Sequence, residues 1–176
     1  MYMFGIGDLA VYPGYGVGKI VDIETKEICG SMTEFLAIEL IENGSKLFVP
    51  KAAAKSKGLR PIIGEDEVEN ILTVLQTERT AKEKKLDTQT WNRRHREYME
   101  KIKTGSVIEI AQVMRDLYIL QGEKELSSGE KNMLDQAKGL LVREVSIATN
   151  TDESEVEEEI RSVFISPSAE MPEAQI

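Results

Sequence analysis

Residues 88–105 read TQTWNRRHREYMEKIKTG and contain the single tryptophan and the single histidine of the chain. Four large side chains recur there at helical spacing and predict one shared helix face: Trp91, His95, Tyr98 and Ile102. Three arginines stand beside the tryptophan, mostly on other faces: Arg93, Arg94 and Arg96. A flat ring among fixed cations suits a nucleic acid, because cations neutralise phosphates and a ring stacks on a base or wedges beside it.

Trp91 allows two interpretations. An aromatic residue at helical spacing commonly belongs to the core of a helical domain. Alternatively, the ring is free to contact a partner, because Trp91 falls in the first turn, ahead of Tyr98 and Ile102. On the second interpretation, we expect Trp91 to be largely exposed to solvent.

The 176 residues suffice for one ordinary domain or two small ones. No apolar run approaches the roughly 20 residues that span a bilayer, and the first residues, MYMFGIGDLAVYPG, lack the basic flank of a secretory signal. Cys29 is the single cysteine, which excludes an internal disulfide and fits a reducing compartment. One cysteine and one histidine also argue against the usual zinc sites. We therefore expect a cytoplasmic protein without a metal.

The net charge of −9 is unevenly distributed along the chain. Residues 151–176 hold eight acidic residues and one basic residue, whereas residues 79–105 hold nine Lys or Arg and four Asp or Glu. A basic segment within an acidic chain is compatible with a small nucleic-acid footprint and argues against broad, non-specific coating of DNA. The alternative is that these charges form an ordinary solvated helix face.

The first 63 residues have the pattern of short strands separated by tight turns. Strands are predicted over residues 8–12, 19–28, 32–41 and 46–50, with a tight turn at residues 29–31 and a two-residue hairpin at Asn43 and Gly44. Such a series predicts a small barrel of the SH3 or Tudor size. The glycines at residues 14–18 lead into a strand instead of a helix, which argues against a nucleotide-binding loop.

After Pro61 the apolar period becomes helical. Helices are predicted around residues 65–75, 91–105, 107–117 and 128–145 and from about residue 152, with residues 76–87 as a helix end and connection. Capping boxes are predicted at Ser106 with Glu109 and at Ser127 with Glu130. The fold class is therefore α+β: a Tudor-like or SH3-like barrel over residues 1–62, a domain of about five helices over residues 63–165, and a disordered tail over residues 166–176.

No catalytic constellation assembles from these residues. The carboxylates lie on amphipathic helix faces and the serines occupy cap positions, so we predict no enzyme activity, catalytic residue, cofactor or small-molecule substrate. The strand LFVP at residues 47–50 is apolar and ends at a proline, which is typical of a sheet edge. Alternation allows only Leu47 with Val49, or Phe48 with Pro50, to face the barrel interior, so the other pair is left for outside contacts.

Several stretches, taken in order, resemble the CarD/CdnL family of bacterial transcription regulators, and most closely its CdnL branch. They are GDLAVYPGYGVGKIVDIE at residues 7–24, FVP at 48–50, and the run at 90–148 with the pieces WxRRxxxxxEKxxxG, RDL and LSxGEKxML. The resemblance covers residues 4–164. It implies a Tudor-like domain that binds the β subunit of RNA polymerase and a helical domain that touches promoter DNA at the upstream edge of the melted bubble. It implies no catalysis and no cofactor.

The resemblance also implies residue roles by position. The tryptophan wedge corresponds to Trp91, and the basic residues around it correspond to Arg93, Arg94, Arg96 and Lys131. The polymerase-facing edge corresponds to Lys26, Ile28, Phe48, Val49 and Pro50. Some family members carry an arginine where this chain has Phe48, which suggests an apolar anchor here.

From the residues and the resemblance together, we expect a monomeric regulator that binds RNA polymerase and promoter DNA and stabilises the open complex. One alternative is a protein–protein adaptor whose helical domain uses Trp91 to bind a protein. Another is an RNA-binding Tudor-like protein, which predicts basic residues on the barrel instead of the helices.

Overall fold

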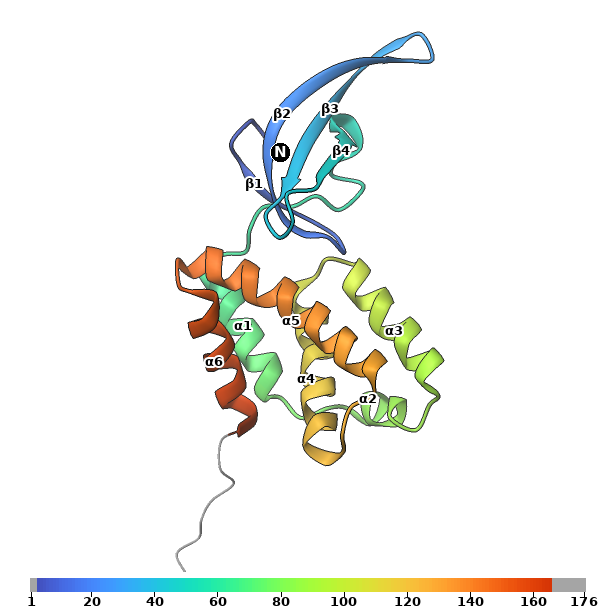
Figure 1. Cartoon of the computed structure of the whole chain (residues 1–176), viewed down its shortest axis with the longest axis vertical. Coiled ribbons are helices and arrows are strands. Elements are labelled where there is room, and N and C mark those ends of the chain that lie inside the picture. The colour runs from blue at the N-terminus through green and yellow to red at the C-terminus, as the bar shows by residue number, and fades with distance from the viewer. Residues whose placement is uncertain (1–2, 166–176) are drawn as a thin grey trace, which may run out of the picture.

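The computed structural model describes residues 3–165, in which a curled four-stranded antiparallel sheet precedes a set of helices (Figure 1). The strands pair in sequence order: β1 (Leu9–Tyr12), β2 (Gly16–Ile28), β3 (Ser31–Leu40) and β4 (Lys46–Pro50). A bridge between Val11 and Arg60 extends the pairing beyond β1. The result is a half-barrel, which confirms the predicted Tudor-like domain. The tail predicted to be disordered lies outside the described residues.

The two central connections of the sheet differ from one another. Cys29 and Gly30 join β2 to β3 in a two-residue turn, both with positive φ (51° and 80°), as predicted for a tight turn here. The predicted two-residue hairpin at Asn43 and Gly44 is wrong, because residues 41–45 connect β3 to β4. The Asn43 side chain accepts a hydrogen bond from the Ser45 N–H at 2.9 Å, and this local turn widens the loop.

The concave face of the sheet has its own hydrophobic core. It consists of Ala10, Ile20, Leu36, Ile38, Val49, Ala54 and Leu59. Along β4 the side chains alternate, so Val49 is 2% exposed while Phe48, on the opposite face, is 45% exposed. Of the two alternatives for this strand, the one with Phe48 facing outward is therefore the one that the protein adopts.

A short 3-10 turn and six α-helices follow the sheet within the described residues. They are η1 (Lys51–Ala53), α1 (Glu65–Gln76), α2 (Ala81–Leu86), α3 (Trp91–Lys103), α4 (Val107–Glu123), α5 (Ser128–Thr149) and α6 (Glu153–Ile165). Residues 76–87 were expected to be a helix end and connection, but they include α2. A capping box starts this helix: Thr80 Oγ1 accepts from the Glu83 N–H, and Glu83 Oε2 accepts from the Thr80 N–H. No helix in residues 3–165 is both long and apolar enough to span a membrane.

The helical core surrounds α4, where two charged residues are buried together. Arg115 Nη2 donates to Glu83 Oε1 at 2.6 Å, and Arg115 Nη1 donates to the Thr77 carbonyl at 3.3 Å. Arg115 Nε also donates to Asp116 Oδ1 at 3.2 Å. Burial raises the pKa of Asp116 to about 6, although Arg115 and Arg79 act to lower it. These contacts fasten the end of α1 and the short helix α2 to α4.

Arg60 joins the sheet to the helices. Its Nη2 donates to Glu144 Oε2 on α5 at 2.9 Å and to the carbonyl of Gly105 at 2.8 Å. Glu144 is 3% exposed and also accepts from the Ile63 N–H at 3.1 Å. We call this cluster of Arg60, Glu144, Gly105 and Ile63 the interdomain joint. The domain boundary at residues 62 and 63 stays a prediction.

Candidate nucleic-acid and protein interfaces

Helices α3 and α5 begin side by side, and Trp91, the first residue of α3, lies at this junction. A Cβ atom placed on Gly129, in the first turn of α5, would lie 2.8 Å from Trp91 Nε1 and 3.0 Å from Cε2 and Cζ2. The indole therefore lies directly against bare backbone. Trp91 is half-buried and packs on the helical core. This corrects the expectation of a largely exposed ring: the ring keeps only part of its surface in solvent.

Arg94 closes another side of the indole. Its guanidinium carbon lies 5.4 Å from the centroid of the Trp91 ring, and its Nη2 donates to Glu130 Oε1 at 2.7 Å. Arg94 is only 7% exposed, so it does not face solvent as the other arginines of α3 do. We therefore leave Arg94 out of the residues that we propose to contact DNA.

Glu130 links the starts of the two helices. Its Oε2 accepts from the Ser127 N–H at 2.9 Å and completes the predicted capping box of α5, while Oε1 accepts from Arg94. Burial acts to raise the pKa of Glu130. The hydrogen bond from Ser127 and the pairing with Arg94 and Lys124 outweigh burial and lower this pKa to about 2. Glu130 is therefore a carboxylate at any physiological pH.

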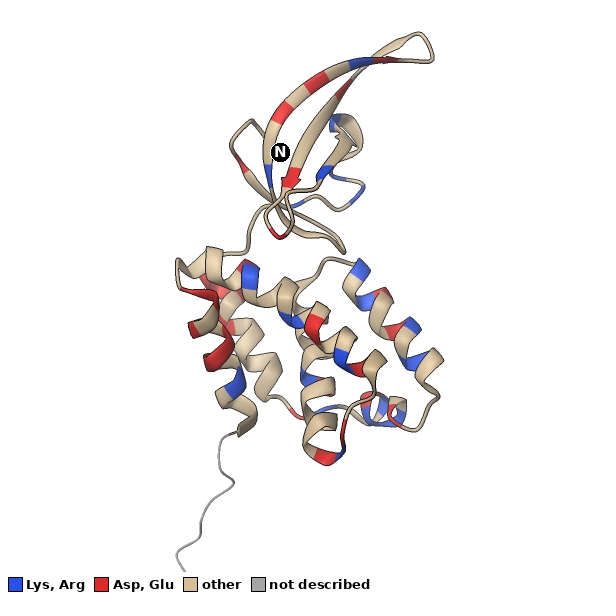
Figure 2. Cartoon of the chain, viewed as in Figure 1, with Lys and Arg blue, Asp and Glu red and all other residues tan. Residues whose placement is uncertain are grey.

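Three of the four cations predicted to flank Trp91 are exposed: Arg93, Arg96 and Lys131. Arg93 Nε lies 3.6 Å from Glu97, and Lys131 Nζ lies 3.3 Å from Glu125. Exposed ion pairs of this kind contribute little, so both cations can exchange their partner for a phosphate. Figure 2 shows Lys and Arg along α3, on the side of the helical domain opposite the acidic helix α6.

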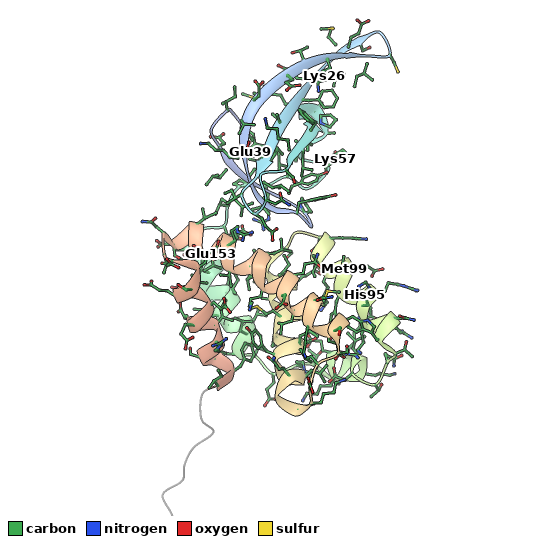
Figure 3. All side chains as sticks on the ribbon, viewed as in Figure 1. Lys26, Glu39, Lys57, His95, Met99 and Glu153 are labelled. Atoms are coloured by element: carbon green, nitrogen blue, oxygen red, sulfur yellow. The ribbon has the colours of Figure 1, made fainter. Side chains whose placement is uncertain are left out.

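Two further residues belong to this surface. His95 is exposed, and its ring meets the Trp91 ring edge-on at 5.4 Å, as expected from their spacing. His95 and Met99 follow one another along α3 (Figure 3). Lys124, which the sequence interpretation missed, is exposed with its Nζ 3.4 Å from Glu130 Oε1. The sequence feature that could have identified Lys124 is its position just before the turn LSSGEK at residues 126–131. We call Trp91, Arg93, His95, Arg96, Lys124 and Lys131 the Trp91 surface.

The second predicted surface lies on the sheet. Lys26 Nζ lies 4.2 Å from the centroid of the exposed Phe48 ring, and Ile28 is exposed nearby on the same strand as Lys26. The Val49 side chain is buried, so only its main chain is available to a partner at this edge. In the described part of the chain, β4 pairs with β3 alone, which leaves its outer edge unpaired.

We call Lys26, Ile28, Phe48 and Pro50, with the outer edge of β4, the sheet surface. Figure 3 shows Lys26 toward the end of the sheet that points away from the helices, far from His95 on α3. Met32, at the tip of the same hairpin, is also exposed and was missed. The sheet surface thus combines an apolar ring, a cation and free backbone groups, which is the composition of a protein-binding edge.

Among residues 3–165, no three His, Cys, Asp or Glu side chains are placed to hold a metal ion. A hollow of about 300 Å³ lies beside Tyr118 and Phe164, whose rings stack at 4.7 Å. Its cations are already paired: Lys138 with Glu157 at 2.9 Å, and Arg161 with an acidic neighbour on its own helix. The cations of the hollow are therefore neutralised by acidic partners, and one further carboxylate, Asp135, lines it.

Comparison with known proteins identifies the family. The model of the CarD-like/TRCF RID domain matches residues 4–63, and that of the CarD C-terminal domain matches residues 70–161. YdeB of Bacillus subtilis (strain 168), named as a candidate transcription factor, is 30% identical over 154 residues, which are 88% of this chain and 97% of YdeB. The solution structure of the 72-residue N-terminal domain of Myxococcus xanthus CarD is 30% identical, covers 34% of this chain and 79% of that domain, and has a TM-score of 0.30. The chain belongs to the CarD/CdnL family of transcription regulators.

Proposed function

We propose that this protein binds the β subunit of RNA polymerase through the sheet surface and stabilises the promoter open complex through the Trp91 surface. The observation that carries the proposal is the grouping of a half-buried indole with exposed cations from α3 and α5. Family membership supports a role in transcription, and the resemblance supports both partners. We propose further that the protein acts as a monomer, in the bacterial cytoplasm, at the nucleoid.

The two surfaces have complementary tasks in this mechanism. Binding of the sheet to polymerase raises the local concentration of the helical domain at the promoter, so a weak DNA contact suffices. Arg93, Arg96 and Lys131 then contact phosphates, which closed and open DNA both offer. These contacts hold the domain on DNA but do not favour melting.

Trp91 supplies the preference for melted DNA. A ligand shifts an equilibrium only by its differential affinity for the two states. An intact duplex has no gap for the exposed part of the indole, whereas the splayed groove at the upstream edge of the bubble does. The buried part of the ring stays against Gly129, so the ring keeps its orientation while its outer edge enters the groove.

The lifetime of the open complex tests this mechanism. For Trp91→Ala, we expect recruitment to polymerase to be unchanged and the lifetime to fall about tenfold, since stacking or wedging contributes about 1–3 kcal/mol. The measurement is dissociation of preformed open complexes after a competitor challenge, at saturating protein. Tyr15→Ala, which removes an exposed ring from the turn between β1 and β2, is the control and should behave as wild type. Equal lifetimes for Trp91→Ala and wild type would reject the wedge.

The same complexes separate this proposal from an adaptor whose helical domain binds a protein. A photo-crosslinker at position 93 or 96 should react with promoter DNA at the bubble edge when polymerase is present. Crosslinks to protein alone from both positions would favour the adaptor. The assignment of the sheet surface to polymerase would survive that result.

A further inference from the structure

Gly129 lies directly against the Trp91 indole, although its backbone conformation does not require glycine. It lies in the first turn of α5, and its φ is outside the left-handed region that favours glycine. Glycine is also among the weakest helix formers, so the helix gains nothing from it at this position. The requirement for a bare backbone must come from something that packs against it.

The other glycines of the long helices provide the contrast. A Cβ on Gly122 in α4, or on Gly139 further along α5, would meet no atom within 4 Å. A Cβ on Gly129 would lie 2.8 Å from Trp91 Nε1, closer than real contacts allow. The missing side chain of Gly129 is therefore matched to the indole.

A second contact with the indole depends on the residue that follows Gly129. Glu130 holds Arg94 over the indole, and this buried arginine keeps two nitrogens, Nε and Nη1, without a hydrogen-bond partner among the described residues. Buried donors without acceptors are costly. The π face of the Trp91 ring, 5.4 Å from the guanidinium carbon, is the electron-rich group that offsets part of this cost. Displacing the ring would remove that partner.

We propose that Gly129 is a positioning residue for Trp91, and that Gly129 together with the Arg94–Glu130 pair forms a seat that fixes the direction of the indole. The inference rests on the proposed function, because a fixed direction matters only if the ring has to meet a defined gap. A ring held in advance loses less conformational freedom when it binds, so more of its contact energy favours the open complex. The SGE triplet thus serves the tryptophan as well as the cap of α5.

Gly129→Ala tests the seat, with Gly139→Ala as the matched control in the same helix. Trp91 is the single tryptophan, so intrinsic fluorescence reports on this ring alone. We expect Gly129→Ala to shift the emission to longer wavelength and to increase quenching by acrylamide, because the added methyl group pushes the indole into solvent. Gly139→Ala should match wild type, and both variants should retain cooperative unfolding, since alanine favours the helix.

The functional arm uses the competitor challenge with polymerase and promoter. Gly129→Ala should shorten the open-complex lifetime by about three- to tenfold, because a misplaced ring loses part or all of its contact. In the double variant with Trp91→Ala, the Gly129→Ala change should add nothing further. Arg94→Lys, which keeps the charge near Glu130 but loses the planar group over the ring, should shift the fluorescence in the same direction and serves as the second variant if Gly129→Ala folds poorly.

The fluorescence and lifetime measurements together test the seat, the positioning role of Gly129 and the proposed function separately. Unchanged fluorescence in both Gly129→Ala and Arg94→Lys would overturn the seat. Shifted fluorescence with a normal open-complex lifetime would overturn the positioning role, provided that Trp91→Ala shortens the lifetime. If Trp91→Ala itself had no effect, the proposed function would fail instead, whereas the fluorescence comparison would still establish or reject the seat.

Discussion

The buried carboxylate of Glu130 has two structural roles. It caps α5 through the Ser127 N–H and neutralises Arg94 of α3, so the starts of both helices depend on it. The pair itself is not evidence of large net stability, because removing both charges from water is costly. Removing one partner is a different matter, since it leaves the other charge buried and unpaired. The cost of that change, and its dependence on pH, can be measured.

For Glu130→Gln, we expect the free energy of unfolding at pH 7 to fall by about 3 kcal/mol, because Arg94 stays buried without a counter-charge. The folded pKa of Glu130, about 2, lies below its ordinary value of 4.5. The carboxylate therefore stabilises the fold fully above pH 4.5 and loses this effect as the pH falls toward 2. At pH 3 the difference between wild type and Glu130→Gln should be smaller by about 2 kcal/mol.

Urea unfolding of both proteins at pH 7 and pH 3 measures this difference. Glu125→Gln is the control, because Glu125 is highly exposed and forms only a surface pair with Lys131. It should have little effect at either pH. A Glu130→Gln difference of the same size at pH 7 and pH 3 would contradict the assigned ion pair.

The sequence predicted the types of residue in this surface but not which of them are exposed. Arg93, Arg94 and Arg96 look alike in the pattern RRHR, yet only Arg94 turns toward Glu130, which lies 36 positions away. Half-burial of Trp91 depends equally on Gly129, a residue of another helix. Helical periodicity reports the face of one helix and carries no information about the neighbour that covers it.

Among the secondary-structure elements, those with a strong local signal were predicted and α2 was not. Strands β2 and β3 follow from apolar runs and a glycine turn, and α5 follows from its capping box and apolar period. The sequence AKEKKL of α2 has no apolar period, although the capping signal of Thr80 and Glu83 was present. Arg115 holds α2 from α4, and Arg79 braces it through Asp87 at 2.8 Å. Tertiary contacts of this kind are invisible in a local pattern.

The exposed Phe48 side chain on β4 tests whether this strand contacts RNA polymerase. Phe48→Ala should weaken binding to RNA polymerase by about 1–3 kcal/mol, roughly tenfold or more in Kd, because it removes the aromatic anchor of the edge and the ring beneath Lys26. The fold should be unaffected, since Phe48 points away from the sheet core. Surface-immobilised polymerase provides the measurement.

Ile41→Ala is the matched control for Phe48→Ala. Ile41 is a comparably exposed apolar residue in the β3–β4 connection, outside the sheet surface. Its variant should bind polymerase as wild type does. If Phe48→Ala and Ile41→Ala bound equally well, the polymerase contact would have to lie elsewhere on the protein.

In the molecule as a whole, the interdomain joint connects the sheet to the helical domain, which lie one above the other in Figure 1. Arg60 belongs to the sheet through its bridge with Val11 and donates to the carbonyl of Gly105, which follows the last turn of α3. Trp91 begins that same helix. Through Arg60, the sheet is thus connected to the end of α3 that lies opposite Trp91. The sequence did not reveal this link, because Arg60 and Glu144 are 84 positions apart.

A rigid joint has a functional consequence if polymerase and DNA are bound at once. The second contact of a bivalent ligand gains from effective concentration, and that gain is largest when the geometry already matches both sites. Arg60→Lys keeps the charge beside Glu144 but lacks the planar guanidinium group that donates to both Glu144 and Gly105. We expect polymerase affinity and Trp91 fluorescence to stay at wild-type values, because both surfaces are intact. The open-complex lifetime should fall by about three- to tenfold.

Small-angle scattering shows whether the joint has loosened, and the competitor challenge then reports the lifetime for the same Arg60→Lys protein. Arg161→Lys, which alters an exposed pair within α6, is the control and should change neither quantity. A broadened scattering profile with a wild-type lifetime would show that a flexible tether is sufficient and that the joint serves only folding. A shortened lifetime with normal polymerase affinity would instead show that the sheet does more than recruit the helical domain, because it also aims Trp91 at the edge of the bubble.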